Sequence, residues 1–191
     1  MLARVFSAAV WGVDAHPVEV EVNCGHGETA MVVVGLPDTA VKESRDRVKT
    51  AVENSGYRRP IGRTTVNLAP ADIKKEGPAF DLPMAVGLLA ASGQMEADGL
   101  EGTWMTGELA LAGDVRPVKG VLAVALAAAA LGARRLLVPA ENAREAGVVQ
   151  GLEIIPVASL RAAVEFVAGT RDIAPVTTDP RSLLEHDADS P

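Results

Sequence analysis

The chain has 191 residues, of which 48% are hydrophobic and only 3% are aromatic. This length suits one domain with or without a tail, and the composition allows a sizeable core built from Ala, Val and Leu. The net charge of −7 excludes nucleic-acid binding that is driven by overall charge. The single cysteine, Cys24, excludes an internal disulfide and is typical of a reducing cytoplasm.

The first part of the chain has the alternating pattern of β-strands. Residues 3–11 and 17–24 are rich in β-branched residues, and a turn leads to a third apolar run at 29–34. We therefore expect a three-stranded antiparallel meander. A helix over residues 39–55 follows, because its apolar and small residues recur at helical spacing while charged residues occupy its other faces.

The centre of the chain is the stretch 70–93, PADIKKEGPAFDLPMAVGLLAASG, which follows a short strand at 64–68. It combines a polar loop, a Gly-Pro breaker and a helix that begins near Phe80 and Asp81. The helix is apolar all round, which predicts a covered, central position. Because a helix N-terminus leaves backbone N–H groups unpaired, the loop has the form of an anion or oxyanion site.

The second half alternates strands and helices, which predicts that part of the sheet is parallel. We expect a β-hairpin from 103–111 and 115–118, a buried Ala-rich helix over 119–131, and an irregular Pro-, Asp- and Ser-rich tail after residue 169. The other expected elements are strands at 135–138 and 153–157 and helices at 141–146 and 160–167.

Motifs for nucleotide and metal chemistry are missing from the sequence. It contains no G-x-x-x-x-G-K-[ST] to hold ATP phosphates and no G-x-G-x-x-G after a strand. The three histidines, His16, His26 and His186, lack the spacing of metal ligands, since a site needs three or four converging groups. We therefore expect no metal site and no cofactor in this chain.

Two segments, 70–93 and 106–141, resemble consecutive parts of Lon-type proteases, in which a Ser after Gly-Pro is the nucleophile and a Lys on the next helix is its base. By alignment these positions hold Ala79 and Leu122, and neither side chain can attack or accept a proton. The resemblance implies a Lon-protease-like α/β fold, of the ribosomal-protein-S5-domain-2-like kind, without catalytic residues. A residual Lon-like peptidase that uses Lys119 is an alternative.

Four longer motifs, spread over residues 3–169, are similar to the N-terminal domain of the magnesium-chelatase-like ComM/YifB family of AAA+ ATPases. They read FSAAVWGVDAHPVEVEV, VVGLPDTAVKESRDRVKTAVENSGY, TVNLAPADIKKEGPAFDLPMAVGLLA and TGELALAGDVRPVKGVL. The resemblance implies a Lon-protease-like domain over residues 1–169. Residues 170–191 would be a linker toward a motor domain that this sequence lacks, because it is either an isolated domain or a truncated gene product.

The same resemblance implies a function for the whole protein. It would be a cytoplasmic hexameric ring that binds ATP and Mg²⁺ in its motor domain and, as in ComM, drives branch migration of DNA. This chain would then be a non-catalytic accessory domain that aids DNA contact or ring assembly. Its expected partners are the AAA+ domain of the same protein, further copies of itself and DNA, with no membrane.

The basic residues are concentrated in residues 42–75, which hold nine of the 18 Lys and Arg but four of the 25 Asp and Glu. Because Lys and Arg bind phosphates of any sequence by releasing counterions, this segment is a candidate DNA contact. A subunit interface or docking surface without DNA is an alternative, as is a solvated helix face with the i,i+4 pairs Glu43–Arg47 and Lys49–Glu53. The candidate DNA-binding residues are Arg45, Lys49, Arg58, Arg59, Arg63, Lys74 and Lys75.

Overall fold

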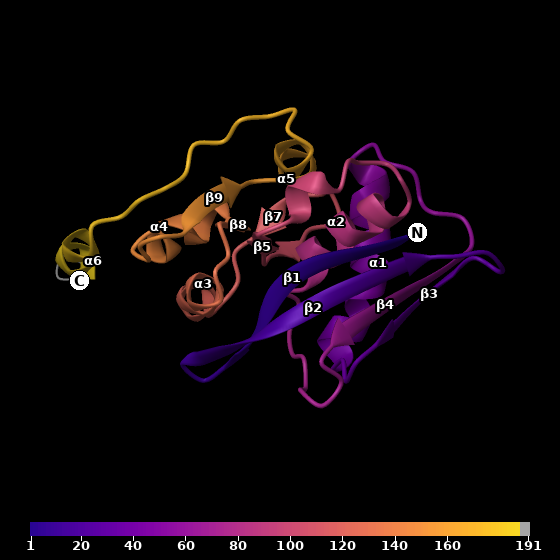
Figure 1. Ribbon diagram of the computed structural model, residues 1–191, viewed down its shortest axis with the longest axis horizontal. Coiled ribbons are helices and arrows are strands. Elements are labelled where there is room, and N and C mark those ends of the chain that lie inside the picture. Colours follow the sequence, from indigo (N-terminus) through magenta and orange to yellow (C-terminus); the bar gives the residue numbers. More distant parts are fainter. Residues whose placement is uncertain (188–191) are drawn as a thin grey trace.

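The computed structural model describes residues 1–187 and shows one mixed sheet of seven strands (Figure 1). Its strands are β1 (Leu2–Trp11), β2 (Asp14–Cys24), β3 (Ala30–Val34), β4 (Arg63–Ala69), β5 (Thr103–Met105), β8 (Arg135–Pro139) and β9 (Glu153–Val157). The order across the sheet is β3-β4-β2-β1-β5-β8-β9. β2 is antiparallel to both of its neighbours, whereas every other pair is parallel. The mixed α/β class expected from the sequence is confirmed.

Helices pack on both faces of the sheet (Figure 1). They are α1 (Thr39–Asn54), α2 (Asp81–Ala91), α3 (Val121–Ala130), α4 (Ala143–Ala146), α5 (Leu160–Val167) and, near the C-terminus, α6 (Pro180–Asp187). Short 3-10 turns lie at Asp98–Leu100 and Ala140–Asn142. The core has two parts because successive strand residues point to opposite faces: Leu137 of β8 joins the cluster under α1, α2 and α5, whereas Leu136 joins the cluster under α3 and α4.

Helix α2 occupies the covered, central position that its apolar sequence predicts. All of its residues are buried, and it packs against β1 and β2 in the middle of the sheet. A Cβ on Gly87 would lie 2.7 Å from Cγ2 of Val22, so glycine is what allows the helix to approach β2 so closely. The helix begins at Asp81, as expected, with Phe80 at its N-cap.

A buried ion pair joins the two helices of this layer. Asp81, the first residue of α2, is fully buried, and its carboxylate accepts from the guanidinium of Arg47 on α1 at 2.9 and 3.2 Å. It also accepts from the backbone N–H of Leu109 at 3.0 Å. Burial raises the pKa of Asp81, and the hydrogen bonds and charge of Arg47 oppose that shift. The pKa of Arg47 is raised, mainly by its hydrogen bond to Asp81.

The expected three-stranded antiparallel meander is wrong in its third strand. β1 and β2 form the predicted hairpin, but β3 pairs in parallel with β4 at the edge of the sheet. The cause is helix α1, which lies between β3 and β4 in sequence. A helical crossover returns the chain in the same direction and so produces a parallel pair.

The expected hairpin at 103–118 divides into two parts. β5 joins the main sheet, and only β6 (Glu108–Leu109) and β7 (Val115–Arg116) form an antiparallel hairpin. The Ala-rich helix begins at Val121 rather than at Lys119, because Gly120 has a left-handed backbone conformation, with φ +78°, that cannot belong to a right-handed helix. Lys119 is therefore outside the helix on which the sequence pattern places it.

The tail after residue 169 is not wholly irregular. Val176 pairs with Ile154 of β9, and α6 follows, so the described part of the tail continues along the sheet edge (Figure 1). His186 lies within α6, and residues 188–191 are outside the described part of the chain. The domain boundary at residue 169 stays a prediction. Within residues 1–187, no helix has the length and apolar character needed to cross a bilayer.

The Arg47–Asp81 pair gives a pH-dependent prediction for stability. Arg47→Met strands a buried carboxylate, so near pH 7.5 we expect a loss of about 3–5 kcal/mol in the free energy of unfolding. Without Arg47, the main opposition to the burial that raises the pKa of Asp81 is lost, and the folded state then binds a proton more tightly than the unfolded state. The loss must therefore shrink as the pH falls toward about 5.

Urea unfolding at the two pH values measures this loss. Arg47→Met/Asp81→Asn removes the stranded charge and should be more stable than Arg47→Met near pH 7.5. Arg45→Met, an exposed neighbour on α1, should change stability by no more than about 0.5 kcal/mol. A loss in Arg47→Met that is the same at both pH values would contradict the role given to the ion pair.

Candidate functional site

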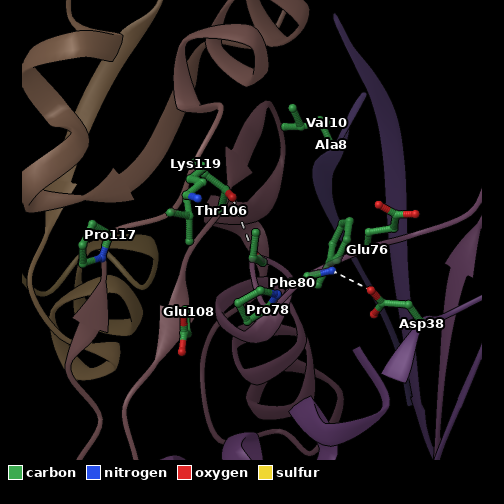
Figure 2. A pocket seen from close by; sticks show the side chains of 13 residues that line it. Ala8, Val10, Asp38, Glu76, Pro78, Phe80, Thr106, Glu108, Pro117 and Lys119 are labelled. Atoms are coloured by element: carbon green, nitrogen blue, oxygen red, sulfur yellow. Dashed lines mark hydrogen bonds between the residues drawn. The ribbon is translucent and has the colours of Figure 1, made fainter. Parts of the chain in front are cut away.

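A cleft of about 570 Å³ opens at the N-terminal end of α2 (Figure 2). The turn at Asp38, the loop before α2, strand β1, strand β6 and the segment before α3 all contribute to its walls. Its lining residues are Ala8, Val10, Asp38, Glu76, Gly77, Pro78, Ala79, Phe80, Thr106, Glu108, Pro117, Val118 and Lys119.

The cleft is held in shape by polar contacts around the start of α2. The carbonyl of Ala79 accepts from the backbone N–H of Gly107 at 2.9 Å and from the hydroxyl of Thr106 at 3.5 Å. Asp38, the N-cap of α1, accepts from Val41 N–H at 2.8 Å. It also accepts from Gly77 N–H at 3.1 Å (Figure 2). These contacts fix the loop before α2, but the N–H groups of Gly77, Asp81 and Leu82 already donate within the protein, so the anion site expected from the sequence stays a prediction.

The chemistry of a Ser-Lys protease is missing from this geometry. Ala79, which the Lon resemblance aligns with the nucleophile, lines the cleft, whereas Leu122, which it aligns with the base, is 40% exposed on the first turn of α3 and lies outside the lining residues. Lys119 does line the cleft. Among the described lining residues, Thr106 has the one hydroxyl group, and it is buried and donates to a carbonyl. A buried hydroxyl bonded in this way is poorly placed to attack a substrate.

The charges of the cleft do not suit a phosphate. Three carboxylates, Asp38, Glu76 and Glu108, line it together with one amine, Lys119. Among residues 1–187, no group of three or more His, Cys, Asp or Glu side chains is placed to hold a metal ion.

The structure removes Lys75 from the candidate DNA-binding residues. Its side chain is fully buried, and its ammonium donates to the carbonyl of Gly35 at 2.8 Å and to the carbonyl of Pro70. Burial lowers the pKa of Lys75 from its ordinary value of 10.5, and the nearby Asp72 opposes this shift. The amine holds two loops together and cannot reach a phosphate. Lys74 is exposed, 3.3 Å from Glu76.

The remaining candidate DNA-binding residues lie on α1, on the loop that follows it and at the start of β4, away from the cleft at the N-terminal end of α2. Lys49 is partly buried, and its pKa is lowered first by that burial and then by the positive charge of Arg59, while Asp46 opposes the shift and Arg45 adds to it. Arg59 borders a small hollow together with Lys49 and a second hollow together with Arg58. Arg63 is exposed at the start of β4, directly after this loop. We call Arg45, Lys49, Arg58, Arg59 and Arg63 the basic surface.

Acidic residues neutralise the basic surface only in part. Glu53 lies 3.8 Å from Arg59, and Asp46 lies 3.8 Å from Arg45. The expected Glu43–Arg47 pair is present at 3.9 Å, but it is secondary to the contact of Arg47 with Asp81. Glu53 contacts Arg59 rather than the Lys49 that the i,i+4 pattern indicates.

Sequence reasoning missed two features of these sites. The i,i+4 pattern places Arg47 on a solvated helix face only as an alternative, and it does not indicate the partner that a lone Asp81 at the start of an entirely apolar helix signals. The sequence pattern of the loop 57–63 indicates only its basic residues and not Ile61, which is 90% exposed. An apolar residue between Arg-Arg-Pro and Gly-Arg is the signal that could have found it.

Comparisons with known proteins show the family of this chain. A family model described as subunit ChlI of Mg-chelatase matches residues 20–142. The chain is 43% identical over 188 residues to the uncharacterized protein YifB of Escherichia coli K12, covering 97% of this chain and 37% of YifB. It is 42% identical over 178 residues to the competence protein ComM of Haemophilus influenzae, covering 93% of this chain and 35% of ComM. It is 30% identical over 127 residues to Lon protease 2 of Bacillus subtilis, covering 66% and 22%.

The fold and the Lon relative thus define a Lon-protease-like domain. Within that class, the chain belongs to the magnesium-chelatase-like family, in the group that contains ComM and YifB. It spans little more than a third of the length of these two relatives.

The buried amine of Lys75 gives a second pH-dependent prediction. Lys75→Met leaves two carbonyls without a donor, and we expect a loss of about 1–3 kcal/mol in the free energy of unfolding near neutral pH. Because the pKa of Lys75 is lowered in the folded state, the folded protein loses this proton at a lower pH than the unfolded chain does. As the pH rises toward 10.5, the unfolded state therefore holds more protons than the folded state. The wild type gains stability over this range and the variant does not, so the difference widens.

Chemical unfolding between about pH 7 and pH 10 measures this difference. Lys74→Met is the matched control, since Lys74 is exposed and adjacent in sequence, and it should change stability by less than about 0.5 kcal/mol. A difference between wild type and Lys75→Met that stays constant with pH would show that the amine is not desolvated.

Proposed function

We propose that this chain is a non-catalytic accessory domain of a ComM/YifB-like AAA+ ATPase, and that its basic surface contacts the phosphate backbone of DNA. The observation that carries the proposal is the grouping of Lys49, Arg58 and Arg59 around two hollows of the surface, both of which Arg59 borders. Grouped cations repel one another, and the phosphates of a DNA backbone offset that repulsion. Contacts of this kind read no sequence, which suits a motor that acts on any DNA.

The architecture and activity of the whole protein are part of the same proposal, and family membership supports them. A motor domain outside this sequence would bind ATP and Mg²⁺, assemble as a hexameric ring in the cytoplasm and drive DNA branch migration. A competence-related role is supported by the name of the Haemophilus relative, competence protein ComM. Catalysis would belong to the motor, because the cleft of this domain lacks a hydroxyl at Ala79.

The DNA contact is tested with Arg58→Glu/Arg59→Glu. We expect its affinity for a fluorescently labelled duplex at low salt to fall by more than about tenfold, with the difference shrinking as salt is added. The slope of log K against log salt should decrease by about 2, since each phosphate contact contributes about 0.9. Fluorescence anisotropy over a salt series measures both quantities.

The control for this experiment is Arg134→Glu/Arg144→Glu, which makes the same change in net charge at two exposed arginines outside the basic surface. It should retain most of the affinity. Equal losses in both double variants would mean that only the overall charge matters, and unchanged binding by Arg58→Glu/Arg59→Glu would overturn the proposal.

A second candidate function, an assembly module without DNA contact, is favoured by the outer face of α3. The sequence predicts a buried helix, but Leu122 and Leu126 are 40% and 54% exposed and α3 carries no polar side chain. Trp11 and Val13 are also exposed, at the tip of the β1–β2 hairpin beside this helix (Figure 1). A helix that is apolar all round is normally covered on all sides.

Self-association of the chain tests the assembly function. If α3 is an interface between copies, the wild type should associate with increasing concentration in sedimentation equilibrium. Leu122→Glu/Leu126→Glu should remain monomeric, because carboxylates would be buried against an apolar face. Leu184→Glu, at an exposed leucine of α6, is the control and should associate like the wild type. A wild type that is monomeric at all concentrations would exclude this role for α3 between copies of the chain.

A further inference from the structure

The loop of residues 57–63 exposes an isoleucine among arginines. Ile61 is 90% exposed, more than any other large hydrophobic side chain in the described part of the chain. Arg58 and Arg59 precede it, and Arg63 follows it. A single exposed apolar residue is ordinary on a protein surface, so its meaning depends on how the loop is held.

The loop is fixed at both of its ends. The side-chain amide of Gln94 accepts from the backbone N–H of Arg58 at 2.8 Å and donates to the carbonyl of Arg58 at 2.7 Å. At the other end, Gly62 N–H donates to the hydroxyl of Thr29 at 3.2 Å, and the carbonyl of Arg63 accepts from Gly25 at 2.8 Å. Both ends of the loop are thus fixed to the body of the domain.

The backbone at the tip also restricts the position of Ile61. Pro60 has a fixed φ, and Gly62 has a φ of +97° with no room for a side chain, since a Cβ there would lie 2.3 Å from the carbonyl oxygen of Gly25. Ile61 lies between these two constraints. Its exposure therefore results from a defined loop geometry.

A hollow of about 390 Å³ lies beside this side chain. Arg58 and Arg59 border it together with Ile61. One small area of the surface therefore offers cations that can bind a DNA phosphate and an apolar side chain that can contact a base. Its lining residues are Cys24, Gly25, His26, Arg58, Arg59, Pro60, Ile61, Ala91, Ser92 and Gln94.

We propose that Ile61 is an apolar wedge that inserts between base pairs of double-stranded DNA held by the basic surface. This inference rests on the proposed DNA contact and adds a preference for distorted DNA. Isoleucine is one of the side chains with which proteins unstack base steps, and arginines on both sides of it can hold the flanking phosphates. Unstacking costs less where a bulge has already disrupted the stack, so such sites are bound more tightly.

The test compares an intact duplex with a duplex of equal length that contains a two-base bulge. We expect the wild-type chain to bind the bulged duplex about tenfold more tightly, and this ratio to fall to about one in Ile61→Ser. Ile61→Leu, which keeps an apolar wedge, should restore most of the ratio. Leu111→Ser removes an exposed leucine elsewhere and should behave like the wild type. A 2-aminopurine base beside the bulge should brighten when the wild type binds and stay dim with Ile61→Ser.

The outcomes separate the wedge from the phosphate contact. A wild type that binds both duplexes equally, or an Ile61→Ser variant that keeps the full preference, overturns the wedge and leaves the phosphate contact in place. Failure of the wild type to bind either duplex at low salt overturns both. Equal melting temperatures of the variants establish that each one is folded.

Discussion

The buried contact between Asp81 and Arg47 is the constraint on which this structure depends. It connects α1 to the first turn of α2, and through Leu109 N–H it also fixes the β6–β7 hairpin. The position of a carboxylate at the start of a helix is favourable, because the N–H groups there carry partial positive charge. Gly107 continues the connection, since it donates to Ala79 and accepts from Leu82. The walls of the cleft are therefore set by directional polar contacts rather than by apolar packing alone.

Helix α2 separates two surfaces of opposite character. Its N-terminal end forms the acidic cleft, and just beyond its C-terminal end Gln94 holds the basic loop. Eleven helical residues place these ends about 16 Å apart. The two ends of one helix therefore differ in the sign of the charges around them.

Two exposed apolar features have different surroundings. Ile61 lies among arginines on a loop that is fixed at both ends, an arrangement that suits a charged polymer with apolar bases. The outer face of α3 has alanines around its leucines and no charge of its own, an arrangement that suits a protein surface. Both functions proposed for the domain can coexist, because these features belong to different elements.

The sequence by itself determined the family, the mixed α/β class and the central position of α2, because these depend on local patterns and on the identity of single residues. It also located the basic segment. Only the tertiary structure decided the parallel pairing of β3, the burial of Lys75, the partner of Arg47 and the exposure of α3 and Ile61. Lys74 and Lys75 are adjacent and chemically identical, yet one is in solvent and the other donates to Gly35, forty residues away in the chain. Long-range contacts decide desolvation, and no local pattern encodes them.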